Sequence, residues 1–283
     1  MITGKTSLVA HVGFPTESFK APLIYNPWFE SRGIDAVVVP MGCKASDYPE
    51  FLRALFRLTN IRGALVTMPH KVSTVALLDV RNEAVEIAGS CNAVRRDPDG
   101  RLRGDMFDGA GFTRGVARKG VPLRGATCLV VGAGGVGSAI AASLAAAEVA
   151  SIAIFDVDAD AAHRLVGRLH SVHPAVQAEV RDNDPADYDI VVNATPLGMR
   201  DDDPLPFDAR RLSPRTFVGE VVMKREMTPL LCGARARGCR YQVGSDMLFE
   251  MIPAYLEFFG FGTATAEELR AVAQITAPRV DRK

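Results

Sequence analysis

The stretch LVVGAGGVGSAI, residues 129–140, decides how the fold of this chain is interpreted. Its apolar start predicts a buried parallel strand, and Gly132, Gly134 and Gly137 follow directly with the spacing Gly-x-Gly-x-x-Gly. Residues 138–147 are rich in alanine and leucine and contain no proline, so they predict a helix that begins at the third glycine. The amides and the positive dipole end of such a helix bind phosphates, and the glycines let the backbone come close. The pattern therefore predicts a site for a dinucleotide pyrophosphate.

A second apolar run, residues 151–155, follows this helix and ends in Asp156. An acidic side chain at this distance from the glycines binds the adenosine ribose hydroxyls. The complete βαβ unit favours dinucleotide binding over a purely structural glycine turn. Asp156 would also repel a 2′-phosphate, and Val157 and Asp158 offer no cation to bind one, so NAD is predicted rather than NADP.

The composition is that of an ordinary globular chain with enough residues for two modest domains. Its 283 residues are 48% apolar, and 33 Lys plus Arg balance 33 Asp plus Glu. This balance favours neither nucleic acid nor a membrane surface as a partner. Five cysteines without Cys-x-x-Cys spacing and an amino terminus without a signal-peptide pattern predict a cytoplasmic protein. His163, His170 and His173 lack a carboxylate or cysteine partner at ligand spacing, so no metal is predicted.

The amino-terminal half alternates apolar strands with helices. Strands are predicted at residues 8–12, 35–40 and 63–67, and helices at 21–33 and 48–58. Lys71 follows the third strand, at the carboxyl end where ligands of such sheets bind, so it is a candidate for chemistry; a surface lysine that begins a helix is the alternative. His11, inside the first strand, is expected to be a core histidine with satisfied hydrogen bonds.

The carboxyl-terminal half continues the same alternation and then becomes helical. Strands are expected at residues 189–193, 217–223 and 240–243, and helices at 159–170, 228–238, 246–260 and 264–273. The last two helices have no strand of their own. We therefore expect them to pack back on the first domain.

These motifs together resemble the shikimate and quinate dehydrogenase family over nearly the whole chain. The matching blocks are Gly13-x-Pro15 with Pro22 and Asn26, Thr67-x-Pro69-His70-Lys71, Gly89 with Asn92, Asp108-Gly109-x-Gly111, Gly132-Ala133-Gly134-Gly135, NATPLGM at 193–199, TPLL at 228–231, and Gly244-x-x-Met247-Leu248. The resemblance implies an α/β fold of two domains with a cleft between them. Residues 1–105 plus 246–283 would form a substrate-binding domain with a mainly parallel sheet, and residues 106–245 a Rossmann domain that binds NAD(P).

In that family a lysine and an aspartate flank the alcohol that is oxidised, and Lys71 and Asp108 match them. A secondary alcohol gives hydride to nicotinamide only as its hydroxyl proton leaves, so a base must take that proton. The resemblance implies that Lys71 is this base, that Asp108 orients it, and that Asn92 donates a hydrogen bond to the substrate. The implied cofactor-binding residues are Gly132, Ala133, Gly134, Gly135, Val136, Gly137, Asp156, Val157, Ala194, Thr195, Pro196, Val221, Gly244 and Met247.

The chain keeps Thr67 but departs from the family pattern at other positions that bind shikimate. Phe19 and Ala21 replace the two carboxylate-binding serines, and apolar residues replace an asparagine, a threonine, a tyrosine and a glutamine, at Leu65, Phe107, Met223 and Met251 respectively. Two lost charge-assisted hydrogen bonds, at about 1.5–3 kcal/mol each, lower the specificity for shikimate by roughly 10² to 10⁴. Lys20, Lys224 and Arg225 are candidates for a replacement contact to a carboxylate.

The cofactor side also departs from the family members that use NADP. They commonly carry Asn-Arg-Thr or Asn-Arg-Ser where this chain has Asp156-Val157-Asp158, so the arginine for the 2′-phosphate is missing. We predict an NAD-dependent dehydrogenase, monomeric or homodimeric, that acts on a ring hydroxy acid or a less polar analogue. A genuine shikimate or quinate dehydrogenase of aromatic amino acid biosynthesis remains an alternative. So does a catalytically silent NAD-binding regulatory protein, although the joint presence of Lys71, Asp108 and Asn92 argues against it.

Overall fold

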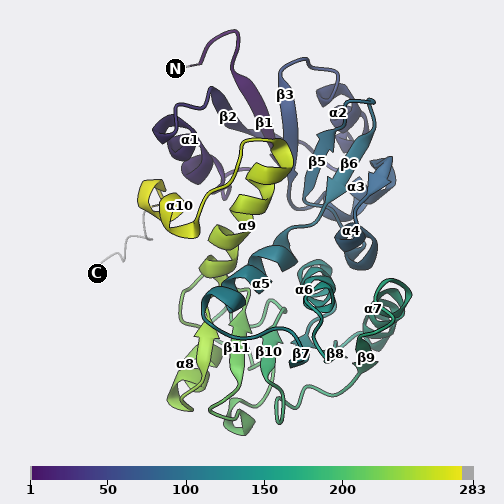
Figure 1. Cartoon of the computed structure of the whole chain (residues 1–283), viewed down its shortest axis with the longest axis vertical. Helices are drawn as coiled ribbons and strands as arrows, with labels where there is room; N and C mark the ends of the chain where they lie inside the picture. The colour runs from purple at the N-terminus through teal and green to yellow at the C-terminus, as the bar shows by residue number, and fades with distance from the viewer. Residues whose placement is uncertain (1, 276–283) are drawn as a thin grey trace. The chain divides into compact units, whose positions relative to one another are not determined.

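Residues 2–275, which the computed structural model describes, form two compact α/β units (Figure 1). The first unit contains residues 2–80, 91–104 and 255–275, and the second contains residues 81–90 and 105–254. The two-domain α/β fold class that the resemblance implies is therefore confirmed. No helix within these residues is both long and apolar enough to cross a membrane.

The first unit is built on a mixed sheet with the strand order β2-β1-β3-β5-β6-β4 among the described residues. Its strands are β1 (Ser7–Gly13), β2 (Ala36–Gly42), β3 (Ile61–Val66), β4 (Val80–Arg81), β5 (Ala93–Arg96) and β6 (Leu102–Asp105). The apolar strands β1, β2 and β3 pair in parallel, as their continuous apolar sequence predicts, whereas β5 runs antiparallel to β3. The three parallel strands end at the same edge of the sheet, where the chain continues into Thr67 and Lys71.

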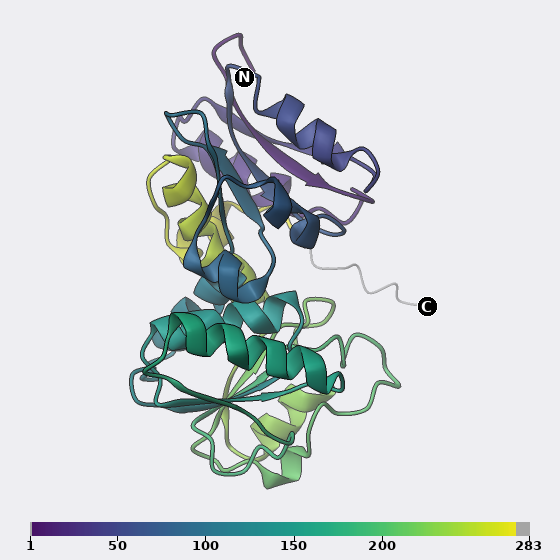
Figure 2. The same ribbon diagram turned by 90° about the vertical axis from the view of Figure 1, so that its right-hand side faces the viewer.

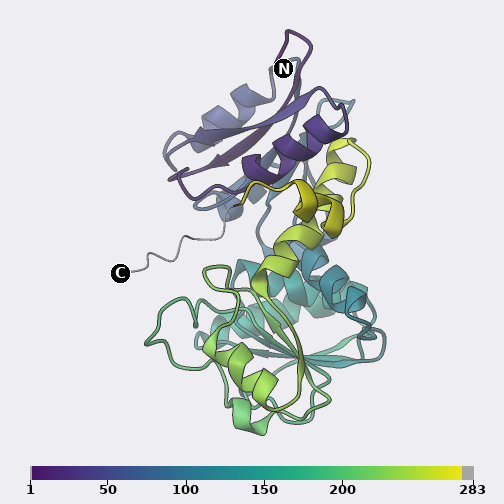
Figure 3. The ribbon, with the colours of Figure 1, turned by 90° about the vertical axis from the view of Figure 1, so that its left-hand side faces the viewer.

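Helices cover this sheet and bury their aromatic side chains. The helical segments of the unit are α1 (Pro22–Ser31), α2 (Tyr48–Leu55), α3 (Lys71–Thr74), η1 (Val75–Leu77) and α10 (Ala266–Val272). Trp28 and Phe29 of α1 are buried, and Phe29 packs against Phe261 with ring centroids 4.9 Å apart. The final helix α10 packs against α1 (Figure 3), as expected for a helix without a strand of its own.

The second unit is a doubly wound Rossmann sheet. Its described strands are all parallel, in the order β12-β11-β10-β7-β8-β9. They are β7 (Thr127–Val131), β8 (Ser151–Phe155), β9 (Gln177–Val180), β10 (Ile190–Asn193), β11 (Phe217–Glu220) and β12 (Arg240–Gln242). The strand order reverses between β7 and β10. In open α/β sheets the ligand binds outside the carboxyl ends of the strands at such a switch point.

The two faces of this sheet are covered by different helices, with α7 on one face and α8 on the other (Figure 2). The helical segments are α4 (Glu83–Ala88), α5 (Asp108–Arg118), α6 (Gly135–Ala146), α7 (Ala159–Val172), η2 (Ala209–Arg211), α8 (Pro229–Ala236) and α9 (Gly244–Phe259), whose residues 255–259 belong to the first unit. A hydrophobic core lies on each face of the sheet, and alternate residues of β7 belong to different cores. Val130 packs with α5, α6 and α7, whereas Leu129 packs with α8 and η2.

The compact units divide the chain differently from the predicted domains in two segments. Residues 81–90 belong to the second unit because α4 packs against α6 and α7. Residues 246–254 belong to it as well, because the first turns of α9 pack so closely on α5 that a Cβ on Gly111 would lie 2.6 Å from Cβ of Met251. The binding roles assigned to the two domains remain predictions.

Two predicted element boundaries at the carboxyl end of the Rossmann sheet are wrong. Helix α6 begins at Gly135 and not at Gly137, because Gly134 is its N-cap and accepts the amide of Ser138 at 2.8 Å. Strand β11 ends at Glu220 and not at Met223, because the Glu220 carboxylate accepts the next two backbone amides. Both differences lie in loops that the candidate cofactor site uses.

Candidate functional site

The glycine loop after β7 has a conformation that side chains would block. Gly132 has φ +111°, and a Cβ there would lie 2.9 Å from the carbonyl of Ala194. A Cβ on Gly137 would overlap the carbonyl oxygen of Gly132. Gly134 differs, because no heavy atom lies within 4 Å of where its Cβ would be. The loop is therefore packed tightly against neighbouring backbone at Gly132 and Gly137, and it faces open space at Gly134.

The start of α6 leaves backbone donors beside this open space. Because Ser138 makes the first helical hydrogen bond, the amides of Gly135, Val136 and Gly137 have no acceptor within the helix. They and the positive end of the helix dipole favour an anion. The residues present therefore fit the pyrophosphate of a dinucleotide, as the glycine spacing predicts.

Asp156 lies directly beside the glycine loop. Its Oδ2 accepts the amide of Ala133 at 2.6 Å, and its Oδ1 accepts the amide of Asp158 at 2.9 Å. The next residue, Val157, is 95% exposed and carries no charge. Arg164 of α7 also reaches this turn, where its guanidinium lies 3.5 Å from the carboxylate of Asp158. Of the charged groups in these contacts, the Asp156 carboxylate lies nearest the glycine loop, and its charge is negative.

A buried polar network joins the carboxyl ends of β10 and β11. Oε1 of the fully buried Glu220 accepts the side-chain amide of Asn193 at 3.0 Å and the backbone amides of Val221 and Val222 at 2.9 and 3.1 Å. Its Oε2 accepts the hydroxyl of Thr228 at 2.9 Å. Burial raises the pKa of Glu220, and the hydrogen bonds oppose this shift.

The same network anchors the loop that follows β10. Oδ1 of Asn193 accepts both the amide and the hydroxyl of Thr195, at 3.1 and 2.6 Å. The side-chain amide of Asn193 also donates to the carbonyl of Leu197 at 3.0 Å. Sequence reasoning missed Glu220, although an acidic residue that closes the apolar strand 217–219 is a signal for such a role. This carboxylate positions two loops at the edge of the sheet.

The other predicted cofactor residues of the second unit lie on these loops or beside them. Gly244 begins α9 against the segment that follows β11, where a Cβ would overlap the carbonyl oxygen of Val222. Met247 belongs to the main core of the unit, and Val136, Ala194 and Val221 pack against this core, as does Met223, which is predicted to bind the substrate. Pro196 is exposed and Thr195 is half-buried. The structure therefore brings most of the predicted cofactor residues to one edge of the Rossmann sheet.

Asp108 is held in place by its own helix. It is the first residue of α5, after the N-cap Phe107, and is 4% exposed. The next residue, Gly109, packs so closely on α6 that a Cβ would overlap the carbonyl oxygen of Ala139. Further along α5, Gly111 contacts α9 beside Met251. The tight helix packing fixes the turn that carries Asp108.

Thr67, Lys71 and Asn92 come together in the first unit, at the carboxyl end of β3. The amide of Thr67 donates to the carbonyl of Val12 at 2.9 Å, so Thr67 continues the line of β3. Lys71 begins α3, and its carbonyl accepts the amide of Cys91 at 2.8 Å. The carbonyl of the adjacent Asn92, a residue only 1% exposed, accepts the amide of Val66 at 2.8 Å. Backbone hydrogen bonds thus hold the lysine and the asparagine segments side by side.

Three of the predicted replacements, Phe19, Ala21 and Leu65, lie in the first unit, whereas Phe107, Met223 and Met251 belong to the second. Phe19 stacks on His11 with ring centroids 4.0 Å apart, and His11 is opposite Leu65 in the parallel register. Ala21 is the N-cap of α1, two residues after Phe19. The expectation that His11 has satisfied hydrogen bonds is wrong, because its Nδ1 is buried and has no partner within residues 2–275. The strand pattern gave no sign of this.

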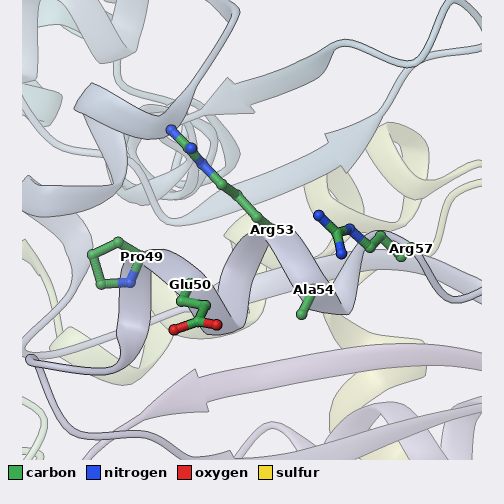
Figure 4. Close-up of a pocket in the computed structure, with 5 residues that line it drawn as sticks. All are labelled: Pro49, Glu50, Arg53, Ala54 and Arg57. Carbon is green, nitrogen blue, oxygen red and sulfur yellow. The ribbon is translucent and has the colours of Figure 1, made fainter.

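The basic residues considered as carboxylate contacts are placed differently from one another. Lys20 and Lys224 are exposed. Arg225 forms an ion pair with Asp201 that lowers the pKa of that carboxyl. A separate pocket at α2 and the residues after it is lined by Pro49, Glu50, Arg53, Ala54 and Arg57, and none of the predicted site residues lines it (Figure 4).

Comparison with known proteins decides the family. The family model described as the shikimate dehydrogenase substrate binding domain matches residues 12–94, and the ThiF family model matches residues 117–160, which include the glycine loop. The NADP-dependent shikimate dehydrogenase of Acidiphilium cryptum is 32% identical over 275 residues, which cover 96% of this chain and 98% of that relative. The chain belongs to the shikimate dehydrogenase family. Members of this family are dehydrogenases that act on a CH–OH group, so the predicted family and reaction class are confirmed.

Solved structures of the family agree with this assignment. The shikimate 5-dehydrogenase of Listeria monocytogenes, in complex with shikimate and NAD, has a TM-score of 0.89 and 27% identity, covering 96% of this chain and 97% of that one. The quinate dehydrogenase of Corynebacterium glutamicum, in complex with NAD, has a TM-score of 0.83 and 29% identity, covering 94% and 98%. The two-domain fold is thus shared along nearly the full length of these chains.

Proposed function

We propose that this chain is an NAD-dependent dehydrogenase that oxidises a secondary alcohol on a ring substrate, and that shikimate is a poor substrate for it. One observation carries the proposal. The polar residues Thr67, Lys71 and Asn92 are retained at the carboxyl end of β3, while Phe19 and Leu65 make the adjoining part of the sheet apolar. Retained reaction chemistry with altered binding residues favours a changed substrate over a silent protein.

The proposed roles of the side chains follow from the chemistry of alcohol oxidation. The nicotinamide, when bound, supplies the hydride acceptor. Lys71 removes the hydroxyl proton at its Nζ, and the carboxylate of Asp108 orients the lysine and the hydroxyl. Asn92 donates a hydrogen bond to a neighbouring substrate oxygen. The amides of Gly135 and Val136 hold the pyrophosphate at the start of α6.

The proposed preference for NAD is supported by the charge beside the glycine loop. The relative from Acidiphilium cryptum is named for NADP, and the two related structures were solved with NAD, so the family accommodates both nucleotides. In this chain the Asp156 carboxylate lies 2.6 Å from the amide of Ala133, and Val157 adds no charge. A 2′-phosphate next to that carboxylate would be repelled, whereas a ribose hydroxyl would donate to it.

The proposal is tested by Lys71→Ala in a screen of hydroxylated ring acids and their uncharged analogues, with NADH formation as the readout. Removal of a general base should lower kcat/KM by roughly 10²- to 10⁴-fold. The affinity for NAD, measured by calorimetry, should not change. Lys5→Ala, which removes an exposed lysine of the same unit, is the matched control and should retain full activity.

The alternatives predict different results in this screen. Oxidation of shikimate or quinate with NAD at about 1–10³ s⁻¹, the ordinary range of enzymes, would support a genuine shikimate or quinate dehydrogenase. Binding of NAD without oxidation of any compound would support a regulatory protein. Equal activity of Lys71→Ala and the wild type would show that the assigned base is wrong.

A further inference from the structure

We propose that His11 is a specificity-determining residue and that the substrate places an uncharged oxygen, a hydroxyl or a carbonyl, against the wall that His11 and Phe19 form. This inference rests on the proposed function, because that function places the substrate at the carboxyl ends of β1 and β3. It narrows the substrate class to alcohols that carry no carboxylate at this end of the molecule.

Strand geometry places His11 on the face that the proposed substrate residues share. Side chains two residues apart in a strand point to the same face, so His11 and Gly13 share one face of β1. A Cβ on Gly13 would lie 2.5 Å from Cγ2 of Thr67 and 2.9 Å from Cζ of Phe19. In the register of β1 and β3, His11 is opposite Leu65, which precedes Thr67 by two residues. His11, Phe19, Leu65 and Thr67 therefore form one continuous wall.

The hydrogen-bonding state of His11 points to a ligand. A neutral imidazole has one donor and one acceptor nitrogen, and buried polar atoms are normally hydrogen-bonded. Nδ1 of His11 is buried and has no partner in the described chain. The other ring nitrogen, Nε2, is not fully buried, because His11 as a whole is only partly buried. Nδ1 itself is closed off, so a ligand can hydrogen-bond only to Nε2, on the ring that stacks on Phe19.

The charge of this wall decides which oxygen it accepts. Burial lowers the pKa of His11 to about 4, so the ring is neutral at pH 7. Phe19 and Leu65 carry no charge either. A carboxylate placed against His11, Phe19 and Leu65 would lose water without gaining a cation from these three side chains. A hydroxyl or carbonyl oxygen needs a single hydrogen bond, which a neutral imidazole supplies.

The first test measures the binding of shikimate and of its uncharged methyl ester to the protein loaded with NAD, by calorimetry. The wild type should bind the ester at least about tenfold more tightly than shikimate. His11→Val should weaken ester binding by roughly 2- to 12-fold, the value of one neutral hydrogen bond. His11→Gln, which keeps a donor and an acceptor, should restore part of the loss. His163→Val, at an exposed histidine of α7, is the control and should leave binding unchanged.

A second variant restores serine at the two positions where Phe19 and Ala21 replace it. Phe19→Ser combined with Ala21→Ser should reverse the order of the two compounds, so that shikimate binds more tightly than its ester. Tighter binding of shikimate by the wild type, binding of neither compound, or ester binding unaffected by both His11 variants would overturn the inference. Ester binding that depends on His11 but occurs without NADH formation would sustain the inference and count against the proposed function.

Discussion

At the residue scale, the charge of single side chains decides which groups bind next to them. Asp156 is the clearest case, because its carboxylate accepts the amide of Ala133 from the glycine loop at 2.6 Å. Its position marked Asp156 as a candidate ribose ligand, since an acidic residue after the second strand of a βαβ unit is a local pattern. The unpartnered nitrogen of His11 had no such pattern, because it depends on the ring of Phe19 that folds over the strand.

The cofactor preference is tested by changing Asp156→Asn and Val157→Arg together. These changes remove the negative charge beside the glycine loop and add a guanidinium that pairs with phosphate. We expect the affinity for NADP, measured by calorimetry, to rise at least about tenfold relative to NAD. Asp160→Asn, at an exposed position on α7, controls for net charge and should not alter the preference. Equal affinities of the wild type for NAD and NADP would contradict the account.

At the element scale, close packing of helices positions the residues proposed for chemistry. Asp108 begins α5, and the adjacent Gly109 has no room for a side chain because the backbone of α6 lies against it. The ends of β10 and β11 are positioned differently, by the buried carboxylate of Glu220. These contacts join segments that are distant in the sequence, so neither periodicity nor turn signals predicted them.

The packing of α5 on α6 is tested by Gly109→Ala. The added Cβ would overlap the carbonyl oxygen of Ala139, and overpacking of this kind costs about 1–3 kcal/mol of unfolding free energy. Gly167→Ala in α7 is the matched control, because nothing lies within 4 Å of the added Cβ. It should raise the unfolding free energy by roughly 0.5–1 kcal/mol, since alanine favours a helix over glycine. Urea denaturation measures the unfolding free energies of both variants. Equal effects of the two substitutions would show that Gly109 does not lie against the backbone of α6.

The role of Glu220 is tested by the pH dependence of stability. Burial raises its pKa in the folded state above the unfolded value of 4.5, so its contribution to stability is fully present below pH 4.5 and is lost as the pH rises through the folded pKa. Glu220→Gln does not titrate. The unfolding free energy of the wild type minus that of the variant should therefore fall as the pH rises above 4.5. A difference that grows with pH would contradict this assignment, and Glu226→Gln, at an exposed position of the same loop, should show no change.

At the scale of the whole molecule, the sequence was most informative where the pattern is local. The glycine spacing and the apolar runs predicted the Rossmann sheet and the three parallel strands of the other sheet. This was possible because the hydrophobic pattern of a strand reflects which of its faces are buried. The exact boundaries between the two compact units could not be predicted from the sequence. Residues 81–90 and the start of α9 join the Rossmann unit through contacts made in three dimensions.

The central claim is that Lys71 and Asp108 act on the same alcohol. It is tested most directly by a double-mutant cycle of Lys71→Ala and Asp108→Asn, with kcat/KM for NAD-dependent oxidation of shikimate or its methyl ester, whichever is faster. We expect each variant to lose about 10²- to 10⁴-fold and the double variant to lose little more than the worse single one, because residues that act as a unit are not additive. Losses that multiply in the double variant, or a single variant with wild-type kcat/KM, would contradict the claim.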